Sequence, residues 1–168
     1  MLVGFVWDGG VEMKSDKFLD VCQKCGALCC KVGGPNFTEE EMKKVLDAGF
    51  EDYFFKVRSK IYELKSKRGR CPYLKKDNSC EIHGVKPILC VCHPVFPNFD
   101  GKAGYSLVEC PLAKVMSGKE IDKCKRDADK VSAELMEAAL DWGTIEDEED
   151  RALVMKRFGR LGEVRDLG

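Results

Sequence analysis

The clearest pattern of apolar and polar positions lies in the last third of the chain. Apolar side chains recur there every three or four residues, at Ile121, Cys124, Ala128, Val131, Leu135, Ala138 and Trp142. This spacing is typical of one face of a helix. Because Ser117 and Glu120 have the capping-box spacing and Gly143 follows the stripe, the pattern predicts one long amphipathic helix.

A further helix is expected after Thr144–Asp147. Its first turn is acidic, which suits the positive end of the helix dipole. Its apolar positions are Leu153, Val154 and Phe158. The tail beyond Gly159 is expected to be loosely held.

The predicted elements of the first two thirds are shorter. Leu2–Trp7 has the composition of a strand. Thr38 and Glu41 form another capping box, which predicts a helix that ends before Gly49. Residues 51–67 mix β-favouring side chains with partial alternation, so strands and a short helix both fit them.

Mixed elements of this kind predict an α+β fold. Residues 1–112 form a small, loop-rich domain with short strands, and residues 113–168 form a helical extension of two helices packed on it. The chain has 168 residues, of which 44% are hydrophobic, so it can bury a core. Its 28 basic and 29 acidic side chains nearly cancel, which argues against nucleic acid or a membrane surface as the partner.

Cysteine is the unusual feature of the composition. There are ten, at positions 22, 25, 29, 30, 71, 80, 90, 92, 110 and 124. The apolar run at the N-terminus is too short for a secretory signal, and no segment reaches the length of a membrane span, so a cytoplasmic location is expected. Thiols stay reduced there, and this cysteine density therefore indicates metal ligation rather than disulfides.

Four of the thiols fall within the nine residues Cys22–Cys30. The Cys22-x-x-Cys25 pair is a metal knuckle, and Gly26 follows where a left-handed residue closes such a turn. In an extended segment the side chains of Cys29 and Cys30 would point to opposite faces. That pair therefore suits two separate metals or a polynuclear cluster reached from both sides.

Further along, the order of cysteines and prolines resembles that of a known family. The pattern continues with Cys71-Pro72, Cys80 with His83, Pro87 with Cys90 and Pro94, and Cys110-Pro111. It resembles the CxxCxxCC family of zinc- or iron-chelating domains, often labelled a predicted iron–sulfur cluster oxidoreductase. The chain departs from the family pattern in one extra residue before Cys29 and in Lys86 and Val91, where arginine is usual.

The resemblance implies a set of eight cysteine ligands: Cys22, Cys25, Cys29, Cys30, Cys71, Cys80, Cys90 and Cys110. Thiolate sets select zinc or iron–sulfur centres over hard cations. Only one clear knuckle is present, and two ligands precede proline as in ferredoxins, so an iron–sulfur cluster, preferably 4Fe–4S, ranks ahead of zinc. Eight thiols fit two four-thiolate sites, or one cluster and a mononuclear site. His83 and His93 could be ligands or merely lie nearby; Cys92 is a spare or resolving thiol, and Cys124 a core residue.

The expected function is metal binding with a redox or cluster-handling role, for an unknown protein or redox partner. An iron–sulfur oxidoreductase is possible on this pattern, but no catalytic residues can be named. The alternative is a zinc-stapled structural or adaptor protein without catalysis. Both readings depend on the metal that the cysteines hold.

Overall fold

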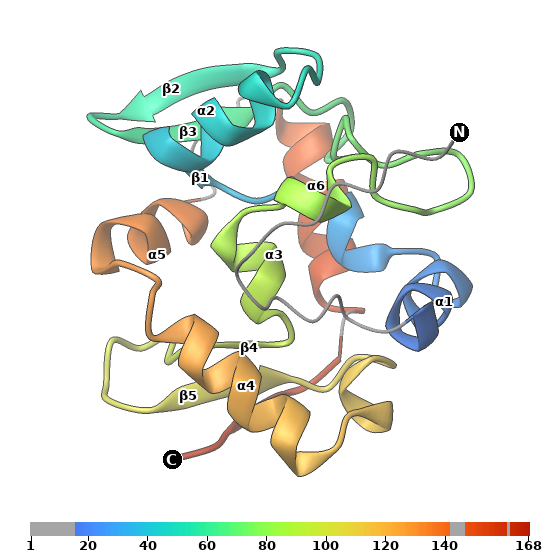
Figure 1. Ribbon diagram of the computed structural model, residues 1–168, viewed down its shortest axis with the longest axis vertical. Helices are drawn as coiled ribbons and strands as arrows, with labels where there is room; N and C mark the ends of the chain where they lie inside the picture. The colour runs from blue at the N-terminus through green and yellow to red at the C-terminus, as the bar shows by residue number, and fades with distance from the viewer. Residues whose placement is uncertain (1–15, 142–146, 161) are drawn as a thin grey trace, which may run out of the picture.

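The computed structural model describes residues 16–141, 147–160 and 162–168. The expected strand at Leu2–Trp7 and the positions Trp142–Glu146 lie outside the described residues. The described part contains α-helices and short antiparallel strands, which confirms the α+β prediction. Two small sheets lie at opposite ends of the molecule, with helices between them (Figure 1).

The first sheet has the strand order β1-β3-β2 and is antiparallel. Its strands are β1 (Phe37–Thr38), β2 (Phe54–Arg58) and β3 (Ile61–Leu64). The region that fitted either strands or a helix is therefore a hairpin. Its inward side chains pack with Tyr73 in a cluster where the rings of Phe37 and Phe54 lie 4.9 Å apart, edge to face. This contact with distant residues favours the extended conformation.

Helix α2 (Glu39–Asp47) begins at the predicted capping box. Thr38 Oγ1 accepts a hydrogen bond from the Glu41 amide, and Glu41 Oε2 accepts one from the Thr38 amide. The other oxygen of Glu41, Oε1, accepts from the amide of Ile88 at 2.6 Å. Ile88 begins helix α3 (Ile88–Cys92), so a single carboxylate fixes the starts of two helices.

The second sheet has the order β4-β5-β6 and is also antiparallel. Its strands are β4 (Val95–Pro97), β5 (Tyr105–Val108) and β6 (Val164–Asp166). The tail expected to be loosely held thus supplies an edge strand, and Glu109 also donates its amide to Glu163 O. That part of the prediction is wrong because pairing with β5 satisfies backbone groups that a loose tail would leave to water.

The predicted long helix is two helices, α4 (Gly118–Ala128) and α5 (Ala133–Ala139). The capping box at Ser117 is present, but Ser132 interrupts the helix, because its hydroxyl accepts from the Leu135 amide and starts a new one. The apolar positions keep their helical spacing on both sides of Ser132. Cys124 and Ala128 pack on the second sheet, and Leu135 and Ala138 pack on Ile61 and Leu89.

Helix α6 (Glu148–Phe158) begins at Asp147, whose side chain accepts from the amide of Asp150. Its first turn is acidic, as the sequence predicts. The remaining helices are α1 (Asp16–Lys24) and the short 3₁₀ helices η1 (Leu28–Lys31), η2 (His83–Val85) and η3 (Ala113–Val115). No described helix is long and apolar enough to cross a bilayer.

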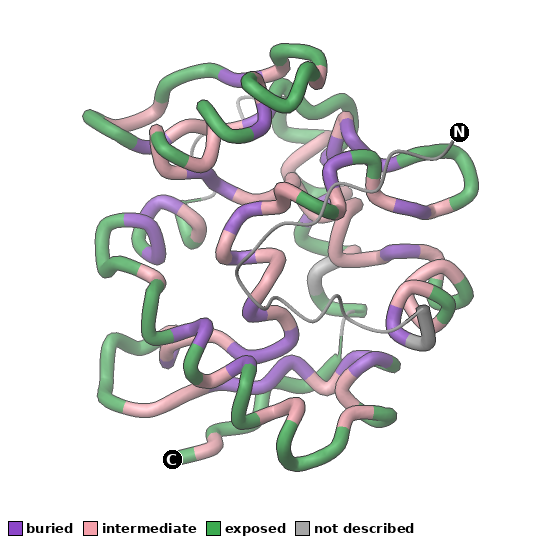
Figure 2. The backbone as a smooth tube through the Cα atoms, viewed as in Figure 1, coloured by how far each residue is buried: buried purple, intermediate pink, exposed green. Residues whose placement is uncertain are grey.

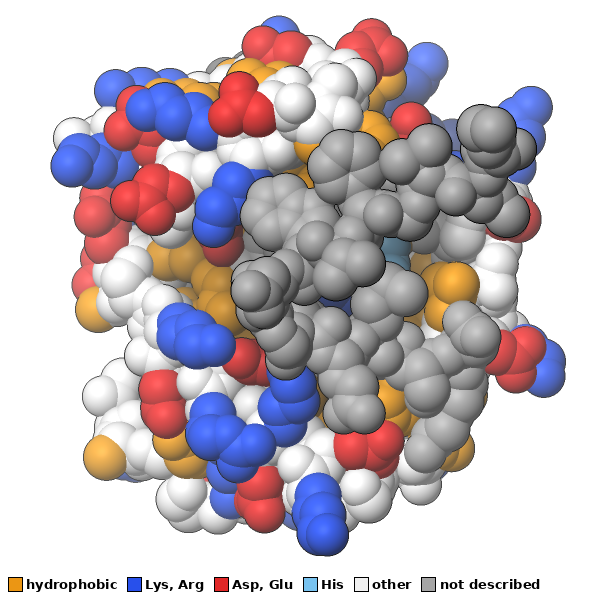
Figure 3. All heavy atoms as spheres, viewed as in Figure 1, with side chains coloured by type: hydrophobic (Ala, Val, Ile, Leu, Met, Phe, Trp, Pro, Cys, Tyr) orange, Lys and Arg blue, Asp and Glu red, His pale blue; other side chains and the backbone are white. Residues whose placement is uncertain are grey.

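Burial and charge follow this arrangement. Buried positions recur along α3 and along β4 and β5 of the second sheet, whereas the edge strand β6 is exposed (Figure 2). On the face shown in Figure 3, acidic and basic side chains are interspersed. The described part of that face therefore carries no patch of one charge sign.

Candidate metal centre

The first cysteine block leaves helix α1 through a left-handed turn. Cys22 lies in the last turn of α1, and Cys25 follows the helix end. Gly26 has φ +80°, as the knuckle predicts, and Ala27 also has a positive φ of 49°. The Ala27 amide donates to Cys22 O at 2.9 Å, which closes the turn. The chain then enters η1, which carries Cys29 and Cys30.

The two adjacent cysteines face each other more closely than predicted. Their Sγ atoms are 4.0 Å apart, because the segment is a 3₁₀ helix and not an extended strand. Two sulfurs on one tetrahedral zinc, with bonds of about 2.3 Å, lie roughly 3.8 Å apart. The expectation that these neighbours point to opposite faces is therefore wrong, and both thiols can serve one centre.

The second cysteine block is joined to the first by its backbone. The Cys71 amide donates to Cys30 O at 2.8 Å. Cys80 pairs with Leu74 in an isolated antiparallel bridge. In the turn between these two residues, Asp77 Oδ1 accepts hydrogen bonds from the amide and the hydroxyl of Ser79. Cys90 lies on α3, whose start Glu41 fixes. These contacts bring thiols from separate segments to one place.

A cavity of about 260 Å³ lies where these segments meet. Its described wall contains five of the eight predicted ligands and both histidines: Cys22, Cys29, Cys30, Cys80, Cys90, His83 and His93. No Asp or Glu is among the described residues of this wall. Soft sulfur and imidazole donors without carboxylates suit zinc or iron and not a hard cation.

The other three predicted ligands are not among the described residues that line the cavity. Cys71 and Cys110 are buried, and Cys25 is exposed. Cys110 Sγ lies 3.6 Å from His93 Nε2. The negative charge of Cys29 would act on both Cys71 and Cys110, and that of Cys25 on Cys110. Burial is the main cause that raises the pKa of Cys71 and Cys110, and a negative charge on Cys29 would raise both further.

The environment holds several of these thiols in the neutral form. A hydrogen bond with Cys30, together with burial, raises the pKa of Cys29 well above its ordinary value. Burial raises the pKa of Cys71 to about 11 and that of Cys90 well above its ordinary value. Burial also raises the pKa of Cys80, while the nearby ammonium of Lys86 acts in the opposite direction on Cys80 and Cys90. A metal bound here would displace protons from them.

The donors surround the cavity without forming a compact set. Within the described ranges, no three Cys, His, Asp or Glu side chains are close enough together to hold an ion. All ten cysteines lie in these ranges, and none forms a disulfide. The residues fit a thiolate-bound centre in chemistry and in number, although the described donors are not arranged as a compact set.

The structure adds residues that the sequence reasoning missed. The apolar part of the wall comes from α1, from β4 and the loop after it, and from α5 with its C-cap. Its aromatic and large aliphatic side chains include Phe18, Phe96, Phe99, Met136 and Leu140. Helical periodicity marked only the buried face of the C-terminal helices and gave no signal that α5 borders the thiols. The described cavity wall also contains Lys86.

Cys92 and Cys124 belong to the core and not to the cavity. Cys92 is 0% exposed and Cys124 is 2% exposed, in one cluster with Val95 and Leu107. The prediction for Cys124 is confirmed. Cys92 packs in the same way, so it is not placed as an accessible resolving thiol.

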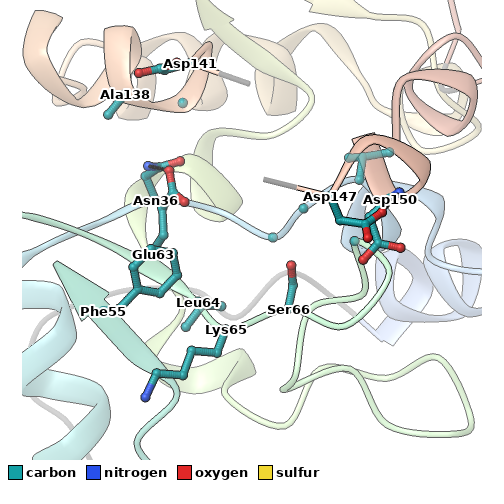
Figure 4. Close-up of a pocket in the computed structure, with 15 residues that line it drawn as sticks. Asn36, Phe55, Glu63, Leu64, Lys65, Ser66, Ala138, Asp141, Asp147 and Asp150 are labelled. Carbon is teal, nitrogen blue, oxygen red and sulfur yellow. Dashed lines mark hydrogen bonds between the residues drawn. The ribbon is translucent and has the colours of Figure 1, made fainter. Parts of the chain in front are cut away.

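A second cavity, of about 370 Å³, shares part of its wall with the first. Figure 4 shows Asp147 and Asp150 at the start of α6 on one side, with Glu63 beside Asn36 on the other. Asn36 donates from Nδ2 to Glu63 Oε1 at 3.2 Å. This wall is acidic, and none of the ten cysteines is among its described residues.

Comparison with protein families identifies the same part of the chain. The family model CxxCxxCC, described as "Putative zinc- or iron-chelating domain", matches residues 21–111. Neither the curated proteins nor the solved structures gave a match. The matched range is more than half of the chain, and it contains all eight predicted ligands and most of the cavity wall. The chain therefore belongs to the CxxCxxCC family of zinc- or iron-chelating domains.

Proposed function

We propose that this protein holds an iron–sulfur cluster, of the 4Fe–4S type, and serves electron transfer or cluster handling for a partner protein. The observation that carries the proposal is a cavity that is lined by thiols from separate segments and by no described carboxylate. Iron–sulfur clusters are held by such cysteine sets. The cluster would supply one-electron chemistry, and the chain would hold and shield it.

The spread of the thiols supports a polynuclear centre over a single zinc ion. One zinc needs four donors within about 4 Å of one another. Two donor pairs have a separation of that size, Cys29 Sγ and Cys30 Sγ at 4.0 Å and Cys110 Sγ and His93 Nε2 at 3.6 Å, and no described trio is compact. A cluster has a wider ligand shell, which fits donors distributed around a cavity.

The chain's own residues would control water and charge at this centre. Phe18, Phe96 and Phe99 give the cavity an apolar side, which lowers the local dielectric constant. Lys86 lies in the wall, where its positive charge favours the ionised forms of Cys80 and Cys90. The solvent exposure of a cluster and the charges and hydrogen bonds around it set its reduction potential.

A zinc-stapled structural or adaptor protein is the second candidate. The 4.0 Å separation of the Cys29 and Cys30 sulfurs favours it, because that distance is close to the spacing of two thiolates on one zinc. In that case the metal would replace part of a conventional core without redox chemistry. The two candidates share the same ligands and differ in the metal.

Anaerobic purification followed by quantification of iron, acid-labile sulfide and zinc separates them. We expect brown protein that contains iron and sulfide in stoichiometric amounts. Cys29→Ser should lose most of both, while Cys124→Ala, the matched control in the core, should keep them. Stoichiometric zinc without iron or sulfide would refute the proposal and support the zinc candidate.

The number of centres can be read from the same preparations. Cys29→Ser and Cys30→Ser should lose different portions of the metal if each thiol serves its own centre. Equal losses would favour one shared centre, which the 4.0 Å separation of the two sulfurs also allows.

A further inference from the structure

Helix α6 lies outside the matched range yet packs against the first cysteine block. Figure 1 shows it beside the blue segment that follows α1, in agreement with the contact between α6 and η1. Arg157 Nη1 donates to two backbone carbonyls, Lys31 O at 3.0 Å and Arg68 O at 2.7 Å. Lys31 directly follows Cys30, and Arg68 lies three residues before Cys71.

The two segments that Arg157 bridges are also bonded to each other. The Gly33 amide donates to Gly69 O at 2.7 Å, and the Cys71 amide donates to Cys30 O at 2.8 Å. Arg157 therefore adds a third link at the place where the two cysteine blocks join. A guanidinium carries several donors in a rigid plane, so it can serve two carbonyls at once.

Packing supports the same junction. Val154, one turn before Arg157, is 0% exposed. A Cβ added to Gly69 would lie 2.3 Å from Val154 Cγ2 and 3.3 Å from Lys31 O. The backbone at Gly69 has φ +71°, so glycine suits both its conformation and the close approach of α6.

We propose that α6 is a clamp that fixes Cys30 relative to Cys71, with Arg157 as its positioning residue. Holding the thiols in place before binding reduces the ordering that metal binding requires. Coupling of this kind is reciprocal, so metal binding also strengthens the docking of α6. The clamp rests on the metal-binding role of the proposed function and not on the identity of the metal.

The test compares Arg157→Met with Lys156→Met in the full chain. Lys156 is an exposed neighbour of equal charge on the same helix, and its side chain makes no hydrogen bond or ion pair in the described part of the chain. Zn²⁺ is the probe, under anaerobic reducing conditions, in competition with a chromogenic chelator. We expect the Zn²⁺ dissociation constant of Arg157→Met to rise about tenfold, as for loss of a charge-assisted hydrogen bond. Lys156→Met should match the original chain, and Arg157→Lys should recover part of the loss.

Chemical unfolding with and without Zn²⁺ distinguishes positioning from general stability. A structural role alone would lower both midpoints equally, whereas the clamp predicts a smaller stabilisation by Zn²⁺ in Arg157→Met. Should that variant fail to fold, hydrogen exchange on the original chain decides. Zn²⁺ should slow exchange of the amides of residues 153–157; unchanged exchange would overturn the clamp.

The two proposals fail separately. Zinc without iron or sulfide in the purified chain would end the iron–sulfur proposal and leave the clamp intact. Equal Zn²⁺ affinity for Arg157→Met and the original chain would overturn the clamp and leave the iron–sulfur proposal intact.

Discussion

Replacing Glu41 by alanine should destabilise the chain more than an ordinary helix cap would. Its Oε2 accepts from the amide and hydroxyl of Thr38, at 2.8 and 3.1 Å, and its Oε1 accepts from the Ile88 amide at 2.6 Å. Loss of the cap costs about 1 kcal/mol. The Ile88 amide, left without its carboxylate, adds about 1–3 kcal/mol. Glu41→Ala should therefore lower the free energy of unfolding by about 2–4 kcal/mol.

The second capping box provides the matched control. Glu120 accepts from the amide and hydroxyl of Ser117, at 2.6 and 2.9 Å, in the same geometry as Glu41 and Thr38. Glu120→Ala should cost about 1 kcal/mol, the value of the cap. Glu41→Gln keeps one acceptor oxygen, so its loss of unfolding free energy should lie between those of Glu120→Ala and Glu41→Ala. The excess for Glu41→Ala measures the contact with α3.

Urea unfolding of the metal-loaded chain, followed by circular dichroism, measures these differences. The midpoint should shift while the slope stays constant, because the surface exposed on unfolding is unchanged. Since α3 carries Cys90, Glu41→Ala should also release metal faster to a chelator than Glu120→Ala. Equal losses of stability in the two alanine variants would refute the role assigned to the Ile88 contact.

Three further predictions concern the thiols and the core. The apparent Zn²⁺ affinity should fall as the pH is lowered from about 8 to about 6. Thiols such as Cys71, with a pKa of about 11, are protonated in this range and must each release a proton when they bind the metal. Competition with a chelator at both pH values measures the affinity, and a constant affinity would contradict the prediction. Tyr73→Phe removes the hydrogen bond from its hydroxyl to Glu51 O at 2.6 Å and should cost about 1 kcal/mol in urea unfolding; no change in midpoint would count against it. Gly69→Ala should cost about 2–4 kcal/mol by the same assay, from the left-handed backbone and the contact with Val154; a neutral result would mean that α6 does not pack there.

The sequence was sufficient to predict local hydrogen bonds and turns, because the residues that form them lie within a few positions of one another. The two capping boxes at Thr38 and Ser117, the left-handed Gly26 and the acidic start of α6 are examples. The order of cysteines identified the family for the same reason, since spacing is a property of the chain. Composition and pattern also sufficed for the α+β class.

Contacts between distant segments decided the rest. Packing on Tyr73 made residues 54–64 a hairpin, and the Ser132 cap divided a helix whose apolar period gave no sign of a break. The 3₁₀ turn brought Cys29 and Cys30 together where an extended chain would part them. Bonds from Arg157 to the backbone beside Cys30 and Cys71 join residues more than 80 positions apart. Side-chain order along a chain specifies which donors exist; only the folded backbone brings them within reach of one another.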